Sequence, residues 1–201
     1  MESPIVVRSR GHLPHWERDL GTYFVTFRLF DSLPAEILAK MKSEGESLLA
    51  NARQLGRELT ASEHHHLASL PEHYLDAGSG ACWLNRPEIA GLVSRALQYF
   101  DPARYELHAW CVMPNHVHVA FTPTPPSQLF DIVHSWKSFT AHRSNLLLHR
   151  TGEFWQREYY DHLIRNQGDL ARVVKYIMDN PTNAGLSNWP WISAKDEQSV
   201  R

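Results

Sequence analysis

His116 and His118 form the clearest chemical signal in the sequence, because a single residue separates them in Met113-Pro-Asn-His-Val-His118. If residues 116–121 form a β-strand, side chains two apart share a face, and both imidazoles point the same way. Two imidazoles and an oxygen donor suit a divalent cation and leave coordination positions open for a phosphate. A cation bound there would polarise a phosphoryl oxygen as a Lewis acid. The alternative is two histidines on an exposed sheet face, since a His-x-His pattern alone is a weak signal.

Tyr176 is the candidate nucleophile, in a helix expected from about Asp169 to Asn180 that Pro181 would end. The apolar stripe of that helix consists of Leu170, Val173, Val174, Ile177 and Met178. At about 100° per residue, Tyr176 falls outside this stripe, on a polar face that it shares with Arg172 and Asn180. A phenol, a guanidinium and an amide would supply a nucleophile, a phosphate anchor and an oxygen ligand. The alternatives are a tyrosine packed between helix and sheet, and an asparagine that only ends the helix before proline.

The remaining pattern predicts the elements that position these side chains. Aromatic and β-branched runs predict strands, and apolar residues at three- and four-residue intervals predict helices. In chain order we expect a strand at 23–29, a helix from 34 into the fifties, a second short helix before 80, a helix at 86–100, a hairpin of strands at 105–112 and 116–121, a helix at 127–147, a strand at 159–164 and the tyrosine helix. Residues 1–20 are expected to form an extended arm, and the tail from Gly185 is expected to be irregular.

This order of elements contains βαββαβ, which predicts an α+β fold with a ferredoxin-like core. The antiparallel sheet of such a core has helices on one face and leaves the other face free for a site. We expect a single domain over residues 1–201, with the core at about 20–190 and additional helices inserted after the first strand at about 34–80.

Charge and composition limit the possible partners. The net charge of −2 does not favour a strong binder of duplex DNA, which requires a basic surface. A nucleic-acid enzyme can still gather its cations locally, and the candidate phosphate contacts are Lys137, Arg143, Arg157, Arg165 and Arg172. No apolar run reaches the roughly 18 residues of a membrane-spanning helix, and the first residues lack the pattern of a secretion signal. We therefore expect a cytoplasmic protein without a membrane partner.

Three separated motifs, in this order, carry a resemblance to a known family. They are Met113-Pro-Asn-His-Val-His118, Phe154-Trp-Gln-Arg-Glu-Tyr-Tyr-Asp161 and Tyr176-Ile-Met-Asp-Asn-Pro-Thr-Asn-Ala-Gly-Leu186. Together they resemble the REP-associated tyrosine transposases, single-tyrosine members of the HUH (His–hydrophobic–His) nuclease superfamily. The resemblance is collinear over about residues 23–189, and the stretch at about 36–80 is longer than the shortest members need.

The resemblance implies a metal-dependent single-strand DNA nuclease that cleaves and rejoins DNA near hairpins of repetitive extragenic palindromes through a 5′-phosphotyrosine intermediate. By position it assigns Tyr176 as the nucleophile and His116, His118 and Asn180 as ligands of Mg²⁺ or Mn²⁺; relatives in insertion-sequence transposases carry Gln in place of this Asn. The implied partner is single-stranded DNA with a hairpin, and the choice between monomer and homodimer stays open. Two alternatives remain: a non-catalytic hairpin-DNA-binding protein on the same fold, and a hydrolase of small phosphoesters that acts through activated water.

Overall fold

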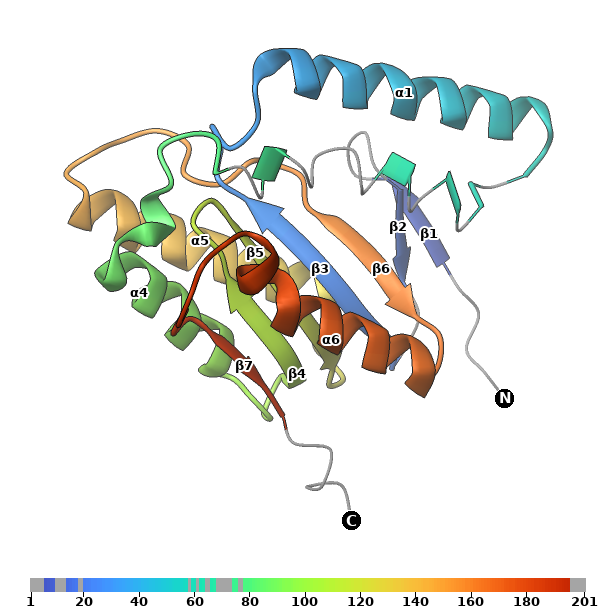
Figure 1. Ribbon diagram of the computed structural model, residues 1–201. Coiled ribbons are helices and arrows are strands. Elements are labelled where there is room, and N and C mark those ends of the chain that lie inside the picture. Colours follow the sequence, from blue (N-terminus) through green and yellow to red (C-terminus); the bar gives the residue numbers. More distant parts are fainter. Residues whose placement is uncertain are drawn as a thin grey trace.

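The computed structural model describes residues 6–9, 14–17, 20–57, 59–60, 62–63, 66–67, 74–75 and 78–195 of the chain. Its centre is a five-stranded antiparallel sheet (Figure 1). In spatial order the strands are β6 (Tyr160–Ile164), β3 (Thr22–Arg28), β5 (His116–Pro123), β4 (Tyr105–Val112) and β7 (Ile192–Ala194). Helix α4 (Pro87–Gln98) connects β3 to β4, and α5 (Leu129–Leu147) connects β5 to β6. The predicted α+β class with a βαββαβ core is therefore confirmed.

One face of the sheet packs against α4 and α5. Successive strand residues point to opposite faces, so Val117, Val119 and Phe121 lie on the same side of β5 and join the main apolar core. Ile132 and Trp136 of α5 belong to this core as well. The apolar half of the alternation in β5 thus faces these two helices, as predicted, and the two histidines between these residues face the other way.

The opposite face, which we expected to be free, is covered in part by α6 (Gln167–Asn183), which crosses in front of the sheet in Figure 1. Asn166 caps the start of the helix: its side-chain Oδ1 accepts a hydrogen bond of 2.9 Å from the main-chain N–H of Asp169. A second apolar cluster lies on this face and includes Phe24, Ala109, Cys111, Ala120 and Ile177. Because this side of the sheet is apolar too, a helix that covers it removes apolar surface from water.

Helix α6 does not end at Pro181 as predicted, because that proline lies inside the helix and is buried. A proline removes one main-chain donor, a small loss in the final turn, and other main-chain bonds close the helix. The N–H of Ala184 donates to the carbonyl of Asn180 at 3.0 Å, and the N–H of Leu186 donates to that of Pro181 at 2.8 Å. Asn180 consequently stays helical, one turn beyond Tyr176 and on the same side of the helix.

The predicted helical insertion begins with α1 (Ala35–Gln54), which lies beyond the end of the sheet at the top of Figure 1. Most of the second helix expected before residue 80 lies outside the described residues. The chain returns to the sheet through Gly80, whose φ is +86° and where a Cβ atom would lie 2.4 Å from the main-chain oxygen of Asp31. Only glycine fits this close approach without a shift of the main chain. The short helix η1 (Trp83–Asn85) follows and leads into α4.

Both terminal segments contain more strand than the sequence predicted. The expected arm includes β1 (Val6–Ser9) and β2 (Pro14–Glu17), which pair antiparallel. The expected irregular tail includes β7, which is held by main-chain bonds such as the 2.8 Å bond from the N–H of Lys195 to the carbonyl of His108. These short strands are fixed by pairing rather than by an alternating pattern, so the sequence gives little sign of them. None of the described helices is long and apolar enough to span a lipid bilayer.

Candidate active site

The two histidines of β5 converge on one point in the interior. Their Nε2 atoms lie 2.9 Å apart, and the ring centroids are 4.5 Å apart. His116 is 1% exposed and His118 is 3% exposed. The alternation of the strand thus delivers both imidazoles to the face covered by α6, with one nitrogen of each ring directed at the other.

The second nitrogen of each ring is held by a polar neighbour. Asn115 donates from its side-chain Nδ2 to the carbonyl of Ser79 at 3.0 Å, which turns its Oδ1 toward Nδ1 of His116 at 2.7 Å. Because an amide oxygen only accepts, Nδ1 of His116 carries the proton and Nε2 of the neutral ring presents a lone pair. Thr26 lies 2.8 Å from Nδ1 of His118 through its hydroxyl oxygen. Such outer partners fix the orientation of metal-binding histidines.

Burial keeps both imidazoles neutral. Loss of contact with water lowers the pKa of His118 from 6.5 to about 3. The same loss, together with the neighbouring His118, holds the pKa of His116 well below its ordinary value. A neutral ring can offer its lone pair to a cation at any pH at which the protein works, so the pair has the protonation state that metal binding requires.

The tyrosine of α6 meets this pair. The ring centroid of Tyr176 lies 5.3 Å from that of His118 and 5.8 Å from that of Phe24, which it contacts edge to face. Tyr176 is half-buried and packs on the sheet, so its expected place outside the apolar stripe is wrong; Met178, expected in that stripe, is instead 38% exposed. The other members of the predicted stripe, Leu170, Val173, Val174 and Ile177, do pack on this face of the sheet.

Asn180 adds a buried oxygen atom from the same helix. Its side chain is 2% exposed, and Oδ1 has no hydrogen-bond partner among the described residues. A buried acceptor without a donor is costly, and a bound cation would remove that cost. The described residues hold no cluster of three or more His, Cys, Asp and Glu side chains able to bind a metal. The amide oxygen of Asn180 would be the third donor beside the histidine pair, and two imidazoles with one oxygen suit a divalent cation.

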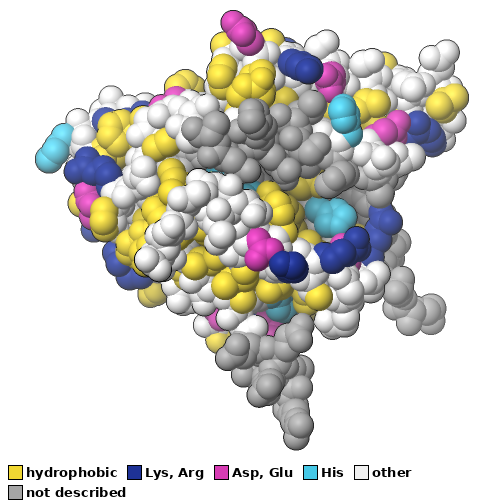
Figure 2. Space-filling model, viewed as in Figure 1, with side chains coloured by type: hydrophobic (Ala, Val, Ile, Leu, Met, Phe, Trp, Pro, Cys, Tyr) yellow, Lys and Arg dark blue, Asp and Glu magenta, His cyan; other side chains and the backbone are white. Residues whose placement is uncertain are grey.

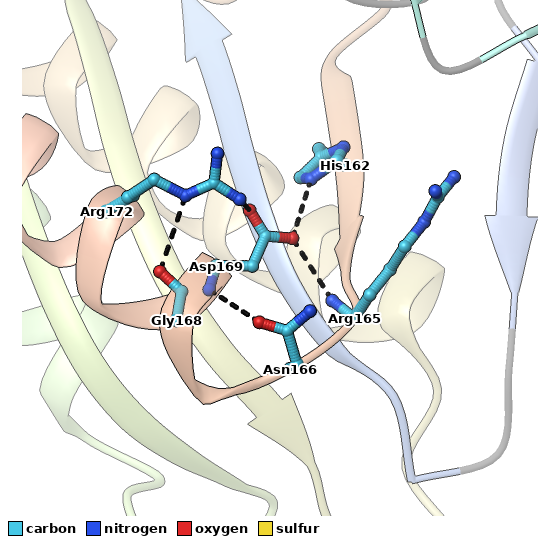
Figure 3. Close-up of polar contacts among 6 residues, drawn as sticks. All are labelled: His162, Arg165, Asn166, Gly168, Asp169 and Arg172. Atoms are coloured by element: carbon cyan, nitrogen blue, oxygen red, sulfur yellow. Dashed lines mark hydrogen bonds and ion pairs between the residues drawn. The ribbon is translucent and has the colours of Figure 1, made fainter.

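Two of the predicted phosphate contacts lie at the start of α6 (Figure 3). Asp169 accepts from Nη2 of Arg172 at 3.1 Å and from Nε2 of His162 at 3.3 Å, and its carboxylate also accepts from the main-chain N–H of Arg165. The guanidinium of Arg165 extends away from this group into solvent. Over α6, Figure 2 shows Lys and Arg side chains mixed with Asp and Glu rather than gathered in a basic patch.

The other three predicted contacts are not brought to the same place. Lys137 donates from Nζ to the carbonyls of Gln156 and Arg157, at 2.8 and 2.7 Å. Arg143 is exposed on α5, the helix on the far side of the sheet from the histidine pair, and the side chain of Arg157 is exposed in the segment before β6. The role of all five residues in DNA binding stays a prediction.

Thr26 and Asn115 orient the imidazoles, and neither residue was predicted from the sequence as part of the site. Asn115 directly precedes the histidine pair, so its place in the turn could have indicated a supporting role. Thr26 is assigned to His118 only by the register of β3 against β5, in which the two residues lie opposite each other. Pairing partners across a sheet cannot be read from one sequence.

The metal-free protein is expected to lose stability as the pH decreases, and His118 is expected to contribute to this loss. The unfolded chain protonates this imidazole near pH 6.5, whereas the folded protein resists protonation down to about pH 3. Stability is therefore complete above pH 6.5 and is lost as the pH falls toward 3, by up to roughly 1.4 kcal/mol per pH unit. Urea unfolding in EDTA at pH 7 and pH 5 should show a smaller loss for His118→Gln than for wild type. Equal losses would mean that the folded protein protonates His118 freely.

Known proteins share sequence and fold with this chain. Residues 91–180 match the family described as Transposase IS200 like. Over 93 residues the chain is 31% identical to the REP-associated tyrosine transposase of Escherichia coli, a match that covers 43% of this chain and 53% of that protein. Over 103 residues it is 28% identical to a Haemophilus influenzae protein provisionally given the same name, with 44% of this chain and 58% of that protein covered. The chain thus spans little more than half the length of these curated relatives.

A solved structure extends the likeness to most of the fold. The structure of a REP-associated tyrosine transposase bound to a REP hairpin matches this chain with a TM-score of 0.52 at 18% identity. The match covers 89% of this chain and 79% of that one. At this level of identity the likeness shows a shared fold.

Proposed function

We propose that this chain, whose residues 91–180 match the family described as Transposase IS200 like, is a DNA transposase that cleaves and rejoins a DNA single strand next to a hairpin. The observation that carries the proposal is the contact between Tyr176 and His118, with ring centroids 5.3 Å apart. These residues come from motifs far apart in the chain, and a nucleophile beside a metal-binding pair is the arrangement that phosphoryl transfer needs.

The reaction that we propose is attack by the Tyr176 hydroxyl oxygen on a phosphodiester. The tyrosine oxygen bonds to phosphorus, and the bond from phosphorus to the 3′ oxygen breaks. The phenol loses its proton to solvent, and the departing 3′ oxygen takes one up, so one strand end carries a 3′-hydroxyl and the other is a 5′-phosphate ester of the tyrosine. No water is consumed, and a 3′-hydroxyl that later attacks the ester rejoins DNA and releases the tyrosine.

The residues around the tyrosine would prepare it for this step. Phe24 and His118 contact its ring from the sheet side and restrict its orientation, which places the hydroxyl before the substrate arrives. Asn115 and Thr26 hold the imidazoles in place from the other side. Because the ordinary pKa of a phenol is about 10, the tyrosine needs positive charge nearby to react near neutrality.

We propose that His116, His118 and Asn180 hold that charge as a divalent cation, Mg²⁺ or Mn²⁺. When bound, the cation would supply Lewis acidity to a non-bridging phosphate oxygen. The neutral state of both imidazoles and the buried, unbonded Oδ1 of Asn180 support this assignment.

The partner that we propose is single-stranded DNA that carries a hairpin, and two observations support it. The E. coli relative is named a REP-associated tyrosine transposase, and a protein with the same fold was solved bound to a REP hairpin. A net charge of −2 suits a protein that binds a local structure better than one that covers long duplex DNA.

The decisive experiment is incubation of the protein with labelled hairpin oligonucleotides that carry single-stranded flanks, in Mn²⁺, followed by a denaturing gel. We expect a slow band that protease removes, because the tyrosine ester survives denaturation. The same oligonucleotide annealed into full duplex should give no such band. Hairpin binding with neither an adduct nor a nick would instead identify a non-catalytic binding protein.

A further inference from the structure

Arg28, the last residue of β3, has no role in the reaction proposed above. In the register of β3 against β5 it lies directly opposite His116, so the two side chains leave the sheet on the same face. The side chain is half-buried, and its Nη1 atom is buried with no hydrogen-bond partner among the described residues. A guanidinium so placed has lost water without gaining an acceptor for that nitrogen.

Burial of the Arg28 guanidinium disfavours its charged form. Burial lowers the pKa of Arg28 from its ordinary value to about 10, and the nearby carboxylate of Glu158 offsets only part of this effect. An uncompensated buried donor on a cation is among the more costly features a protein can keep. Such a feature is retained without penalty where a ligand with negative charge and free acceptor oxygens occupies the site.

Lys137 places a second cation within electrostatic range of the same point. Burial, and after it the charge of Arg28, lower its pKa from 10.5 to about 8. The main chain ties the two cations together: the N–H of Gln156 donates to the carbonyl of Arg28 at 2.8 Å, and Lys137 donates to the carbonyl of Gln156 at 2.8 Å. Arg28 and Lys137 thus both lie within electrostatic range of the carboxylate of Glu158 and of each other.

We infer that Arg28 binds a backbone phosphate of the DNA single strand, at a position adjoining the histidine pair. The inference rests on the proposed function for the identity of the ligand, because a strand whose phosphodiester lies at Tyr176 continues past His116 and carries further phosphates. A guanidinium offers paired donors that match phosphate oxygens, and Nη1 still lacks an acceptor. Lys137 acts through its charge, since its ammonium is already bonded to two carbonyls.

The test measures binding of a fluorescent hairpin oligonucleotide with single-stranded flanks in a Tyr176→Phe background, where no covalent capture can occur. Arg28→Gln should weaken binding roughly tenfold and reduce the salt dependence by about 0.7 in the slope of log K against log salt. Arg28→Lys should restore most of the slope but only part of the affinity. Arg95→Gln, which removes an exposed arginine from α4 on the opposite side of the sheet, should change neither quantity.

Methylphosphonate linkages, which lack the phosphate charge, locate the contact. Placed one at a time along the strand, a single linkage near the cleaved position should weaken binding of the Arg28 protein and leave that of Arg28→Gln unaffected. An unchanged Kd and slope for folded Arg28→Gln would overturn the inference. Should that variant fail to fold, a scan of the Arg28 protein in which no single linkage matters would overturn it equally.

Thermal unfolding separates a binding role from a structural one. If Arg28 serves a ligand, Arg28→Gln should unfold at the same or a higher temperature than its parent without DNA, because it removes a buried charge. A large loss of stability, together with a linkage scan of the Arg28 protein in which no single linkage matters, would assign Arg28 to the fold and overturn the inference. If the proposed function is wrong, the protein that retains Tyr176 will form no covalent adduct. The binding measurements above do not depend on that adduct, so the two failures can be distinguished.

Discussion

A Tyr176→Phe protein is expected to form no covalent adduct with a hairpin substrate, a loss of at least about a thousandfold, while it still binds the DNA. The substitution removes one oxygen atom and keeps the ring that packs on His118 and Phe24. The fold, the histidine pair and the binding surface should therefore persist. A denaturing gel measures the adduct, and fluorescence anisotropy under native conditions measures the binding.

The chain offers a matched control in Tyr160, a second tyrosine on the same face of the sheet. Its ring centroid lies 6.4 Å from that of Phe24, and it is half-buried on β6. Tyr160→Phe should form the adduct at the wild-type rate. If Tyr160→Phe loses the adduct and Tyr176→Phe keeps it, the nucleophile is Tyr160; if both variants cleave normally, neither tyrosine is the nucleophile.

His116→Ala is expected to lower the rate of cleavage by roughly a hundredfold or more, because it removes one of the proposed ligands of the cation. The substitution also leaves Oδ1 of Asn115 without its imidazole partner, so some loss of stability is expected as well. Calorimetric titration with Mn²⁺ should show weaker binding, and the rate of adduct formation should fall in parallel. The control is His108→Ala, which removes a histidine of the same sheet that bonds to Thr122.

Removal of the metal provides an independent check on the same step. EDTA should reduce the wild-type rate to about that of His116→Ala, and it should cause little further loss in that variant, because both treatments remove one function. A wild-type rate that EDTA does not change would exclude a cation from the reaction. Additive losses would show that His116 acts in some way besides holding the metal.

Much of the architecture could be predicted because the patterns are strong and local. The alternation in His116–Phe121 indicated a strand with imidazoles on one side, and the structure places Val117 and Val119 in the core on the other. The spacing of apolar residues in 86–100 predicted a helix, and α4 is found at Pro87–Gln98. Periodicity reports which side of an element is buried, and that was sufficient to predict the order βαββαβ.

The packing of Tyr176 on the sheet could not be predicted, because it depends on which side chains α6 contacts. Counted along the sequence, Tyr176 lies outside the apolar stripe, yet the sheet offers it Phe24 and His118. The half-polar tyrosine packs there, whereas Met178 is exposed. Likewise, Thr26 and Arg28 alternate in β3 with apolar neighbours like ordinary surface residues, and only their register against β5 gives them a place beside the histidines.

The orientation of His116 depends on the inserted segment that contains α1. The segment returns through Ser79 and Gly80, and the carbonyl of Ser79 is the acceptor that turns Asn115 toward the imidazole. A shortened chain must therefore keep a carbonyl at that point, or the amide is free to rotate and the ring loses its fixed tautomer. The closure of this loop therefore helps to set which nitrogen of His116 carries the proton.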